Sequence, residues 1–253
     1  MKLDKTKPIR RIAVYFFYDK DGIVDDYIPY LLRDLVKNIE KLIFVSNGPL
    51  TAESKEKLAE FNPVILEREN KGLDVWAYKE AMLSVGWQEL ARYQEVVLLN
   101  YTLMGPVHPF KEAFDAMAER NVHFWGLTRH YGLPFDPWKT CKYGYVPMHI
   151  SSSFMVFRSD FIQAKALQHY WETMPQIRTY AESVGWHEVI FTKDFTSMGF
   201  KSDVYINTDD LKDYHEYPMM LYPRELVENR GCPVWKRKVF YNIYNEFIEV
   251  SPG

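Results

Sequence analysis

The sequence predicts an α/β fold built around a mostly parallel β-sheet. Strand-like and helix-like patterns alternate through the first hundred residues, an order that is typical of parallel strands joined by right-handed crossovers. The strand-like runs are apolar without interruption, as in VVLL at residues 96–99, which indicates strands that helices cover on both faces. Since 47% of the 253 residues are hydrophobic, the chain has enough apolar material for one large core.

Four strands and three helices are expected in the first half of the chain. The strands are predicted at residues 12–17, 42–46, 64–67 and 96–99, and the helices at residues 25–41, 51–60 and 75–85. In the first helix, apolar residues from Ile28 to Ile39 recur at helical spacing. Pro29 falls in the first turn of that helix, where proline is tolerated.

Mixed strand directions are expected in the second half. Its predicted elements are aromatic loops at 129–145, a strand at 152–158, a helix at about 161–174, and a helical run at 186–200 followed by a strand. Gly199 is typical of a helix C-terminus. No segment resembles a linker, so we expect a single domain over residues 1–253, with halves at about 11–110 and about 111–253.

Composition excludes several classes of function. The formal net charge of −3 gives no broad attraction to nucleic acid. Cys141 and Cys232 have no ligand spacing around them, which gives little support to a disulfide framework or a zinc site and favours a reducing compartment. The first eleven residues are rich in charged side chains, and no apolar stretch is long enough for a signal peptide or a membrane span. We therefore expect a cytoplasmic protein, with peripheral contact with the inner face of the cell membrane left open.

Polar side chains follow each of the four predicted strands of the first half. Because the carboxyl ends of parallel strands share one edge of a sheet, where ligands bind, we expect these side chains in one site. Asn side chains can pair with a base or a ribose, and glycine lets the backbone approach a ligand. The predicted ligand-side residues are Tyr18, Asn47, Asn70, Gly72, Asp74, Asn100 and Thr102. Alternatively, Asp74 only caps its helix and Asn47 only begins a turn. Neither GxGxxG nor a GKS or GKT phosphate loop is present.

A second candidate is Glu188, which is expected early in the helical run at 186–200. An acid there can simply complement the helix dipole. Alternatively, a carboxylate aimed at the sheet edge suits a general base that takes a proton from an acceptor hydroxyl. His149 and Ser151, just before the strand at 152–158, are expected to line an acceptor pocket.

Seven segments together resemble the rhamnan synthesis protein F family, bacterial glycosyltransferases of cell-wall rhamnan and O-antigen assembly. The segments are VDDYIPYLL, FVSNG, ENKGLDVWAYKEAM, YQEVVLLNYTLMGP, FWGLTRH, HISSSFMVFR and HEVIFTKDFTSMGF. The similarity runs from about Ile12 to Tyr244 and includes the late WKRKVFYNIY. The order and spacing of these segments, more than any one motif, carry the resemblance.

The resemblance implies a type A glycosyltransferase fold, a single Rossmann-like domain that takes a nucleotide-diphospho-sugar donor. Residues 11–110 would bind the nucleotide sugar, and residues 111–253 would hold the acceptor and catalytic groups. Asn70, Gly72 and Asp74 match the family's N-x-G-x-D on the nucleotide side, and Glu188 falls in the base position. On the acceptor side we also expect Trp125, in FWGLTRH, and His187, beside Glu188.

Metal dependence is left open. Type A enzymes commonly place an Asp-x-Asp at the end of the central strand to hold a divalent cation, Mg²⁺ or Mn²⁺, against the donor diphosphate. This chain has Asn100, Tyr101 and Thr102 there, so that Tyr101 replaces the usual aspartate. Candidates to neutralise the diphosphate instead are Lys71, Lys193 and the basic run at 236–238.

The predicted function is inverting transfer of a sugar, L-rhamnose from dTDP-rhamnose, to a glycan or lipid-linked glycan acceptor. One alternative is a non-catalytic glycan-binding or scaffold protein that keeps the fold, because Tyr101 replaces an aspartate and residues 129–145 are rich in aromatic side chains. A phosphate or nucleotide hydrolase is a third possibility. The chain is also compatible with being one domain of a longer glycosyltransferase.

Overall fold

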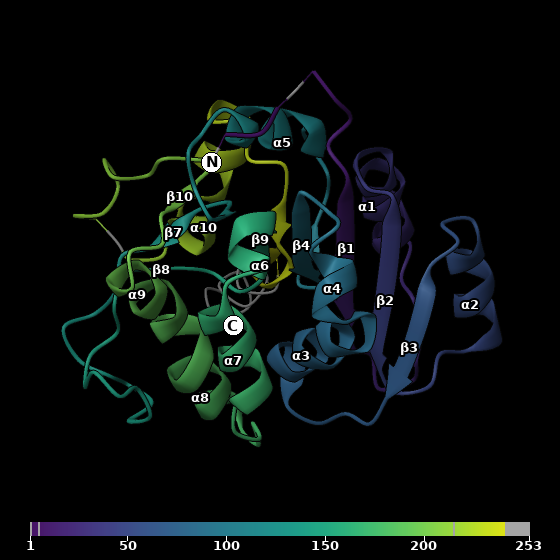
Figure 1. The fold of residues 1–253 in the computed structure, drawn as a ribbon, viewed down its shortest axis with the longest axis horizontal. Helices are drawn as coiled ribbons and strands as arrows, with labels where there is room; N and C mark the ends of the chain where they lie inside the picture. Colours follow the sequence, from purple (N-terminus) through teal and green to yellow (C-terminus); the bar gives the residue numbers. More distant parts are fainter. Residues whose placement is uncertain (1, 5, 215, 241–253) are drawn as a thin grey trace, which may run out of the picture.

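The computed structural model describes residues 2–4, 6–214 and 216–240. Its centre is a seven-stranded sheet (Figure 1). In spatial order the strands are β3 (Val64–Arg68), β2 (Lys41–Asn47), β1 (Arg11–Phe17), β4 (Glu95–Asn100), β9 (Phe154–Arg158), β6 (Phe124–Gly126) and β10 (Ser202–Val204). Only β9 runs antiparallel to its neighbours β4 and β6. The predicted α/β class, with a mostly parallel sheet and mixed directions in the second half, is confirmed.

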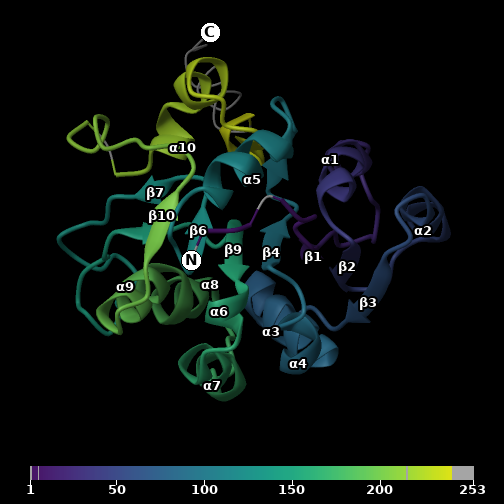
Figure 2. The same ribbon diagram turned by 45° about the horizontal axis from the view of Figure 1, so that its top comes forward.

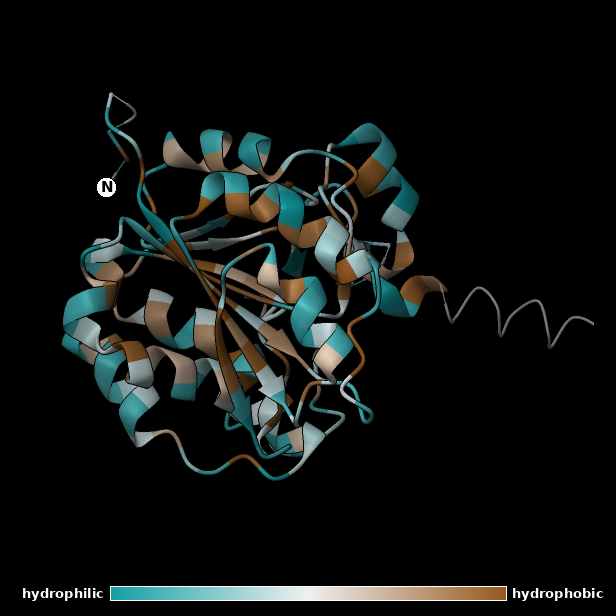
Figure 3. Ribbon diagram, turned by 90° about the vertical axis from the view of Figure 1, so that its right-hand side faces the viewer, coloured by the Kyte–Doolittle hydropathy of each residue, from teal (hydrophilic) through white to brown (hydrophobic). Residues whose placement is uncertain are grey.

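Helices cover both faces of the sheet. One face carries α1 (Tyr27–Leu35), α2 (Ala52–Ala59) and α5 (Phe110–Ala118), and the other carries α3 (Leu73–Val85), α4 (Trp87–Leu90), α6 (Ser159–Ile162), α7 (Lys165–Thr173) and α9 (Val189–Ser197). Figure 2 shows α1 and α5 on one side of the strands and α3, α4 and α7 on the other. Alternate residues of β1 face the two helical layers: Tyr15 packs into one core and Val14 into the other. This explains why the strand is apolar throughout, as the hydropathy colours of the central strands also show (Figure 3).

The predicted elements of the first half are confirmed to within a few residues. The first helix is shorter than expected, because α1 passes into a 3₁₀ turn, η1 (Val36–Asn38). The prediction of a single helix at about 161–174 is wrong. The chain forms α6 and α7 instead, because Ala164 has an extended backbone (φ −68°, ψ 123°) that interrupts the helix. The new direction buries Leu167 and Trp171 of α7 against the sheet.

Two small ribbons lie beside the main sheet. Strand β5 (Leu103–Met104), just after β4, pairs antiparallel with β11 (Trp235–Lys236), so that the late basic segment lies beside the end of the central strand. Strand β7 (Arg129–His130) pairs with β8 (His149–Ile150). The short helix α10 (Pro218–Leu221) and the π-helical turn η3 (Glu225–Asn229) precede β11. Residues 241–244 of the WKRKVFYNIY resemblance lie outside the described residues.

Within the described part of the chain, no helix has both the length and the apolar character that crossing a membrane requires.

Candidate active site

The carboxyl ends of β1, β2, β3 and β4 meet at one edge of the sheet, because these strands are mutually parallel. Two of the predicted asparagines are linked there. The Asn47 amide, at the end of β2, donates to the side-chain oxygen of Asn70 across 3.2 Å. The guanidinium of Arg68 donates both to Asn47 and to the backbone carbonyl of Lys71. The structure therefore fixes the loop after β3 against the end of β2.

Gly72 shapes the entry to α3. Its φ of 71° lies in the left-handed region, and a Cβ at this position would collide with the side chain of Trp76, so that glycine is required on both grounds. Gly72 itself occupies the N-cap position. The interpretation of Asp74 as the N-cap is therefore wrong. Asp74 is the second residue of α3, and its Oδ1 accepts from the Val75 N–H at 2.9 Å.

Asp74 is joined to the end of the central strand. Its Oδ2 accepts a hydrogen bond of 3.0 Å from the Asn100 amide, and the Asn100 oxygen accepts from the backbone N–H and the hydroxyl of Thr102. Burial, followed by the negative charge of Glu188, raises the pKa of Asp74 to about 6. Asp74 and Glu188 therefore interact electrostatically, although they are far apart in the sequence.

This raised pKa predicts a pH-dependent stability. The folded-state pKa of Asp74, about 6, lies above the ~3.9 of an unfolded aspartate. The folded chain thus binds this proton more tightly, and stability is lost as the pH rises from about 4 to about 6. The free energy of unfolding of Asp74→Asn, minus that of the native chain, is expected to rise by about 2 kcal/mol between pH 4 and pH 7. Urea unfolding at several pH values measures this difference, in which any constant effect of the substitution cancels. A difference that does not vary with pH would contradict the raised pKa.

Glu188 lies in the middle of a helical segment. The segment begins with α8 (Tyr180–Ser183), which Thr179 and Glu182 start as a capping box, and continues through the π-helical turn η2 (Val184–Glu188) into α9. The expectation that Glu188 lies early in its helix is wrong, and the helix-dipole explanation loses its basis. The C-terminal glycine is confirmed, since Gly199 follows α9 with a φ of 92°. π-Helical turns inside α-helices are frequent at functional sites.

Two serines after β8 hold the Glu188 carboxylate. Its Oε1 accepts from the Ser152 backbone N–H and from the Ser151 hydroxyl, each at 3.1 Å. Burial acts to raise the pKa of Glu188, but His149, Lys236 and these two hydrogen bonds outweigh it and leave the pKa below its usual value. The site therefore holds two interacting carboxylates whose pKa values are shifted in opposite directions.

His149 lies between this carboxylate and a pocket. It is 4% exposed, and its ring stacks on His130 with centroids 4.7 Å apart. Burial lowers the pKa of His149, against the opposing effect of Glu188. The pocket, about 360 Å³ in volume, is lined by His149 together with Arg129, Tyr145 and Lys193.

Two predicted acceptor-side residues lie in the core instead. Trp125, on β6, is 0% exposed, and its indole N–H donates to Glu95 at 3.0 Å. His187 is 1% exposed and lies among aromatic rings, with its Nδ1 2.7 Å from the Tyr170 hydroxyl. Burial lowers the pKa of His187 to about 4. The assignment of Trp125 and His187 to an acceptor surface is therefore wrong, because both side chains are enclosed in the core.

The remaining strand-end residues surround Tyr101. Tyr18 is half-buried at the end of β1. The Tyr101 ring packs edge-on against Phe16 and Phe17, and its backbone carbonyl accepts from the Tyr27 hydroxyl at 2.8 Å. Burial raises the pKa of Tyr101. The side chain that replaces the usual aspartate is thus a packed, neutral aromatic ring.

The basic run near the end of the described residues lies at this site, which the sequence alone left open. The Lys236 ammonium donates to the Thr102 hydroxyl at 3.2 Å. The Arg237 backbone N–H donates to the Thr102 carbonyl at 2.7 Å, and its guanidinium stacks over the Tyr27 ring at 5.2 Å. The other candidates are engaged elsewhere: Lys71 pairs with Glu69, and Lys193 donates to Tyr145.

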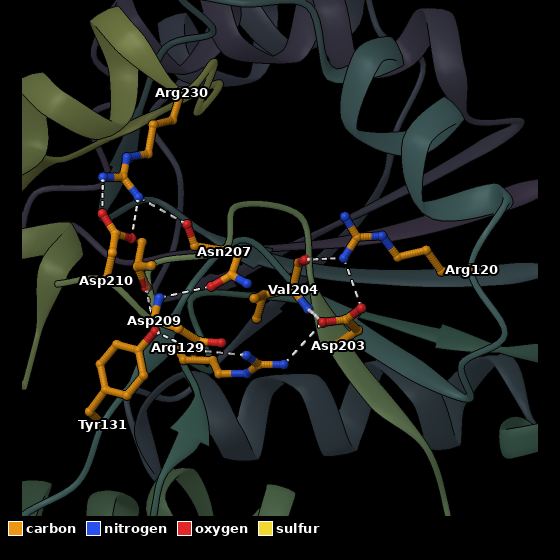
Figure 4. A network of polar contacts seen from close by, with 10 residues as sticks. Arg120, Arg129, Tyr131, Asp203, Val204, Asn207, Asp209, Asp210 and Arg230 are labelled. Atoms are coloured by element: carbon orange, nitrogen blue, oxygen red, sulfur yellow. Dashed lines mark hydrogen bonds and ion pairs between the residues drawn. The ribbon is translucent and has the colours of Figure 1, made fainter. Parts of the chain in front are cut away.

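Arginines neutralise the aspartate pair at 209–210 (Figure 4). Asp209 accepts from Arg129 at 3.3 Å, and Asp210 forms two hydrogen bonds of 2.7 Å with Arg230. Asp203 accepts from both Arg129 and Arg120. This network links the loop after β10 to β7, which indicates a structural role for Asp209 and Asp210. Across the described residues, no group of three or more His, Cys, Asp or Glu side chains could hold a metal ion.

Comparisons with known proteins were made for the sequence and for the fold. An uncharacterized protein of Sinorhizobium fredii is 22% identical over 210 residues, which make up 82% of this chain and 52% of that protein. The chain thus spans about half the length of the curated relative that it matches.

Among solved structures, a mannosyltransferase of S. cerevisiae has a TM-score of 0.41 at 12% identity, with 71% of this chain and 62% of that one covered. A 4-diphosphocytidyl-2C-methyl-D-erythritol synthase of Anaerococcus prevotii has a TM-score of 0.45 at 13% identity, with 78% and 89% covered.

The family model described as rhamnan synthesis protein F matches residues 42–251. These residues include β2 except its first residue, and all later strands of the sheet. The seven-stranded, mostly parallel α/β sheet is consistent with the type A glycosyltransferase fold that this resemblance implied. Because the match spans most of the sequence, the chain belongs to the rhamnan synthesis protein F family.

Proposed function

We propose that this chain carries the catalytic site of an inverting glycosyltransferase that moves L-rhamnose from dTDP-rhamnose to a growing glycan. The observation that carries the proposal is the pair of carboxylates, Asp74 and Glu188, beside Asn100 at the carboxyl edge of the sheet. Pairs of acids whose pKa values are pushed apart are typical of sites that use them in different roles. The family name supports rhamnose as the sugar.

Glu188 is the general base in this proposal. Its lowered pKa keeps it ionised at neutral pH, and the hydrogen bonds from Ser151 and Ser152 orient it. Its carboxylate takes the proton of an acceptor hydroxyl, and that oxygen attacks the anomeric carbon. The bond from the anomeric carbon to the diphosphate oxygen breaks, and the nucleoside diphosphate leaves from the opposite face.

The two sides of the edge have different tasks. The linked Asn47 and Asn70, with Gly72 and Asn100, suit the nucleoside, because they offer amide groups and close backbone approach. The pocket next to His149 suits the acceptor, since Tyr145 and polar side chains line it. The division into a nucleotide-sugar half and an acceptor half remains a prediction. So do a lipid-linked acceptor, a cytoplasmic location and peripheral contact with the membrane.

Calorimetric titration with dTDP, UDP and GDP, together with a transfer assay from dTDP-rhamnose, tests the proposal. We expect dTDP to bind more tightly than UDP or GDP, and rhamnose to be transferred with inversion. If UDP or GDP binds more tightly than dTDP, the donor in the proposal changes, but the proposed reaction class stays the same. Glycan binding with no affinity for any nucleotide would overturn the proposal in favour of a glycan-binding protein, for which Tyr145 in the pocket wall offers an aromatic side chain.

A further inference from the structure

We infer that the Lys236 ammonium takes the place of a divalent cation at the donor diphosphate, so that this site binds its nucleotide without metal. The inference rests on the proposed function and names the group that neutralises the leaving diphosphate. It is carried by three observations: the protein groups at the usual metal position, the place of Lys236, and the engagement of the other nearby cations.

The residues at the metal position do not fit a hard cation, which prefers carboxylate oxygens. The Asn100 amide nitrogen donates to Asp74, and its oxygen accepts twice from Thr102. The Tyr101 ring packs between Phe16 and Phe17 rather than presenting an anionic oxygen. Asp74 has one oxygen on a backbone N–H and the other on Asn100. The Asn100 amide, the Thr102 hydroxyl and the Asp74 carboxylate are therefore already hydrogen-bonded within the protein.

Lys236 brings a positive charge to the same place. Pairing of β11 with β5 sets Lys236 opposite Leu103, and its ammonium lies 3.2 Å from the Thr102 hydroxyl. Its charge favours the ionised forms of both Asp74 and Glu188. A half-buried ammonium at the end of the central strand can attract a diphosphate as a point charge, with no ligand shell to assemble.

The neighbouring cations have other partners. The Arg68 guanidinium pairs with Glu80 and with Asn47. Arg237 stacks on Tyr27 and lies 3.5 Å from Asp25. Lys236 acts electrostatically on Asp74 and Glu188, but its hydrogen bond is to the neutral Thr102 hydroxyl, which a phosphate oxygen can replace or share.

The test is calorimetry with dTDP and with thymidine, each in the presence of Mg²⁺, Mn²⁺ or a chelator. We expect dTDP to bind equally well in all three conditions. Lys236→Met should weaken dTDP binding at least tenfold and leave thymidine binding unchanged, because thymidine has no phosphate. Lys238→Met is the matched control: Lys238 is exposed two residues further along, and its substitution should leave dTDP affinity unchanged. Lys236→Arg should restore most of the affinity.

The outcomes separate the inference from the proposed function. Binding of dTDP that the chelator abolishes would overturn the inference and leave the transferase proposal intact. A Lys236→Met chain that binds dTDP as tightly as the native chain would also overturn the inference. Failure of the native chain to bind any nucleotide, with or without metal, would overturn the proposed function itself. If Lys236→Met does not fold, calorimetry of the native chain with dTDP in the presence of a chelator still tests the inference.

Discussion

Replacing Glu188 with Gln is expected to lower the rate of rhamnosyl transfer by roughly 10²- to 10⁴-fold, the range of a lost general base. The substitution keeps an oxygen that can accept from Ser151 and Ser152, so the helical turn and the loop after β8 should stay in place. The affinity for dTDP should therefore change little, which would place the loss in the chemical step. Rates of transfer and calorimetry with dTDP measure the two effects separately.

A second measurement on the same variant checks the coupling of the two acids. The charge of Glu188 helps to raise the pKa of Asp74, so Glu188→Gln should lower that pKa, as read by NMR titration of the Asp74 carboxyl. Glu182→Gln is the matched control, because Glu182 lies in the same helical segment but accepts from the backbone N–H groups of Arg178 and Thr179 at its start. Full turnover by Glu188→Gln would exclude it as the base, and loss of dTDP binding would assign it a structural role.

The sequence predicted which edge of the sheet gathers the polar residues after the strands, because the rule behind that prediction is topological. Continuous apolar runs predicted strands buried on both faces, and β1 has both faces covered. Once the strands are parallel, the residues that follow them must share an edge, as Asn47 and Asn100 do. No knowledge of side-chain packing is needed for that step.

Side-chain burial was not predictable in the same way. Trp125 and His187 are residue types that suit a ligand site, but their exposure depends on how distant elements pack. Trp125 meets Phe114 of α5, and His187 meets Tyr170 of α7. The π-helical turn at Glu188 has no local sequence signal either. Whether Lys236 reaches the site depends on a contact with Thr102 across 134 positions, to which no local pattern points.

Replacing Glu95 with Gln is expected to destabilise the fold by about 3 to 5 kcal/mol, the range for removing one partner of a buried ion pair. Glu95 is 0% exposed and accepts from the Arg11 guanidinium at 2.6 Å and from the Trp125 indole at 3.0 Å. It also pairs with Arg158 at 3.0 Å. Gln keeps the volume but leaves two buried guanidinium groups without their carboxylate. Urea unfolding of both proteins measures the difference.

Glu40→Gln is the control for this charge effect. Glu40 also pairs with an arginine, Arg10 at 2.9 Å, but both side chains are more than a third exposed, and such pairs contribute about 1 kcal/mol or less. Equal losses of unfolding free energy in the two variants would mean that burial does not increase the contribution of the Glu95 carboxylate to stability. Glu95 starts β4 and Asn100 ends it, roughly 16 Å away at the rise of a strand. A folded Glu95→Gln chain should therefore keep its affinity for dTDP, since the pair stabilises the amino end of the central strand while the groups proposed to bind the ligand lie at its carboxyl end.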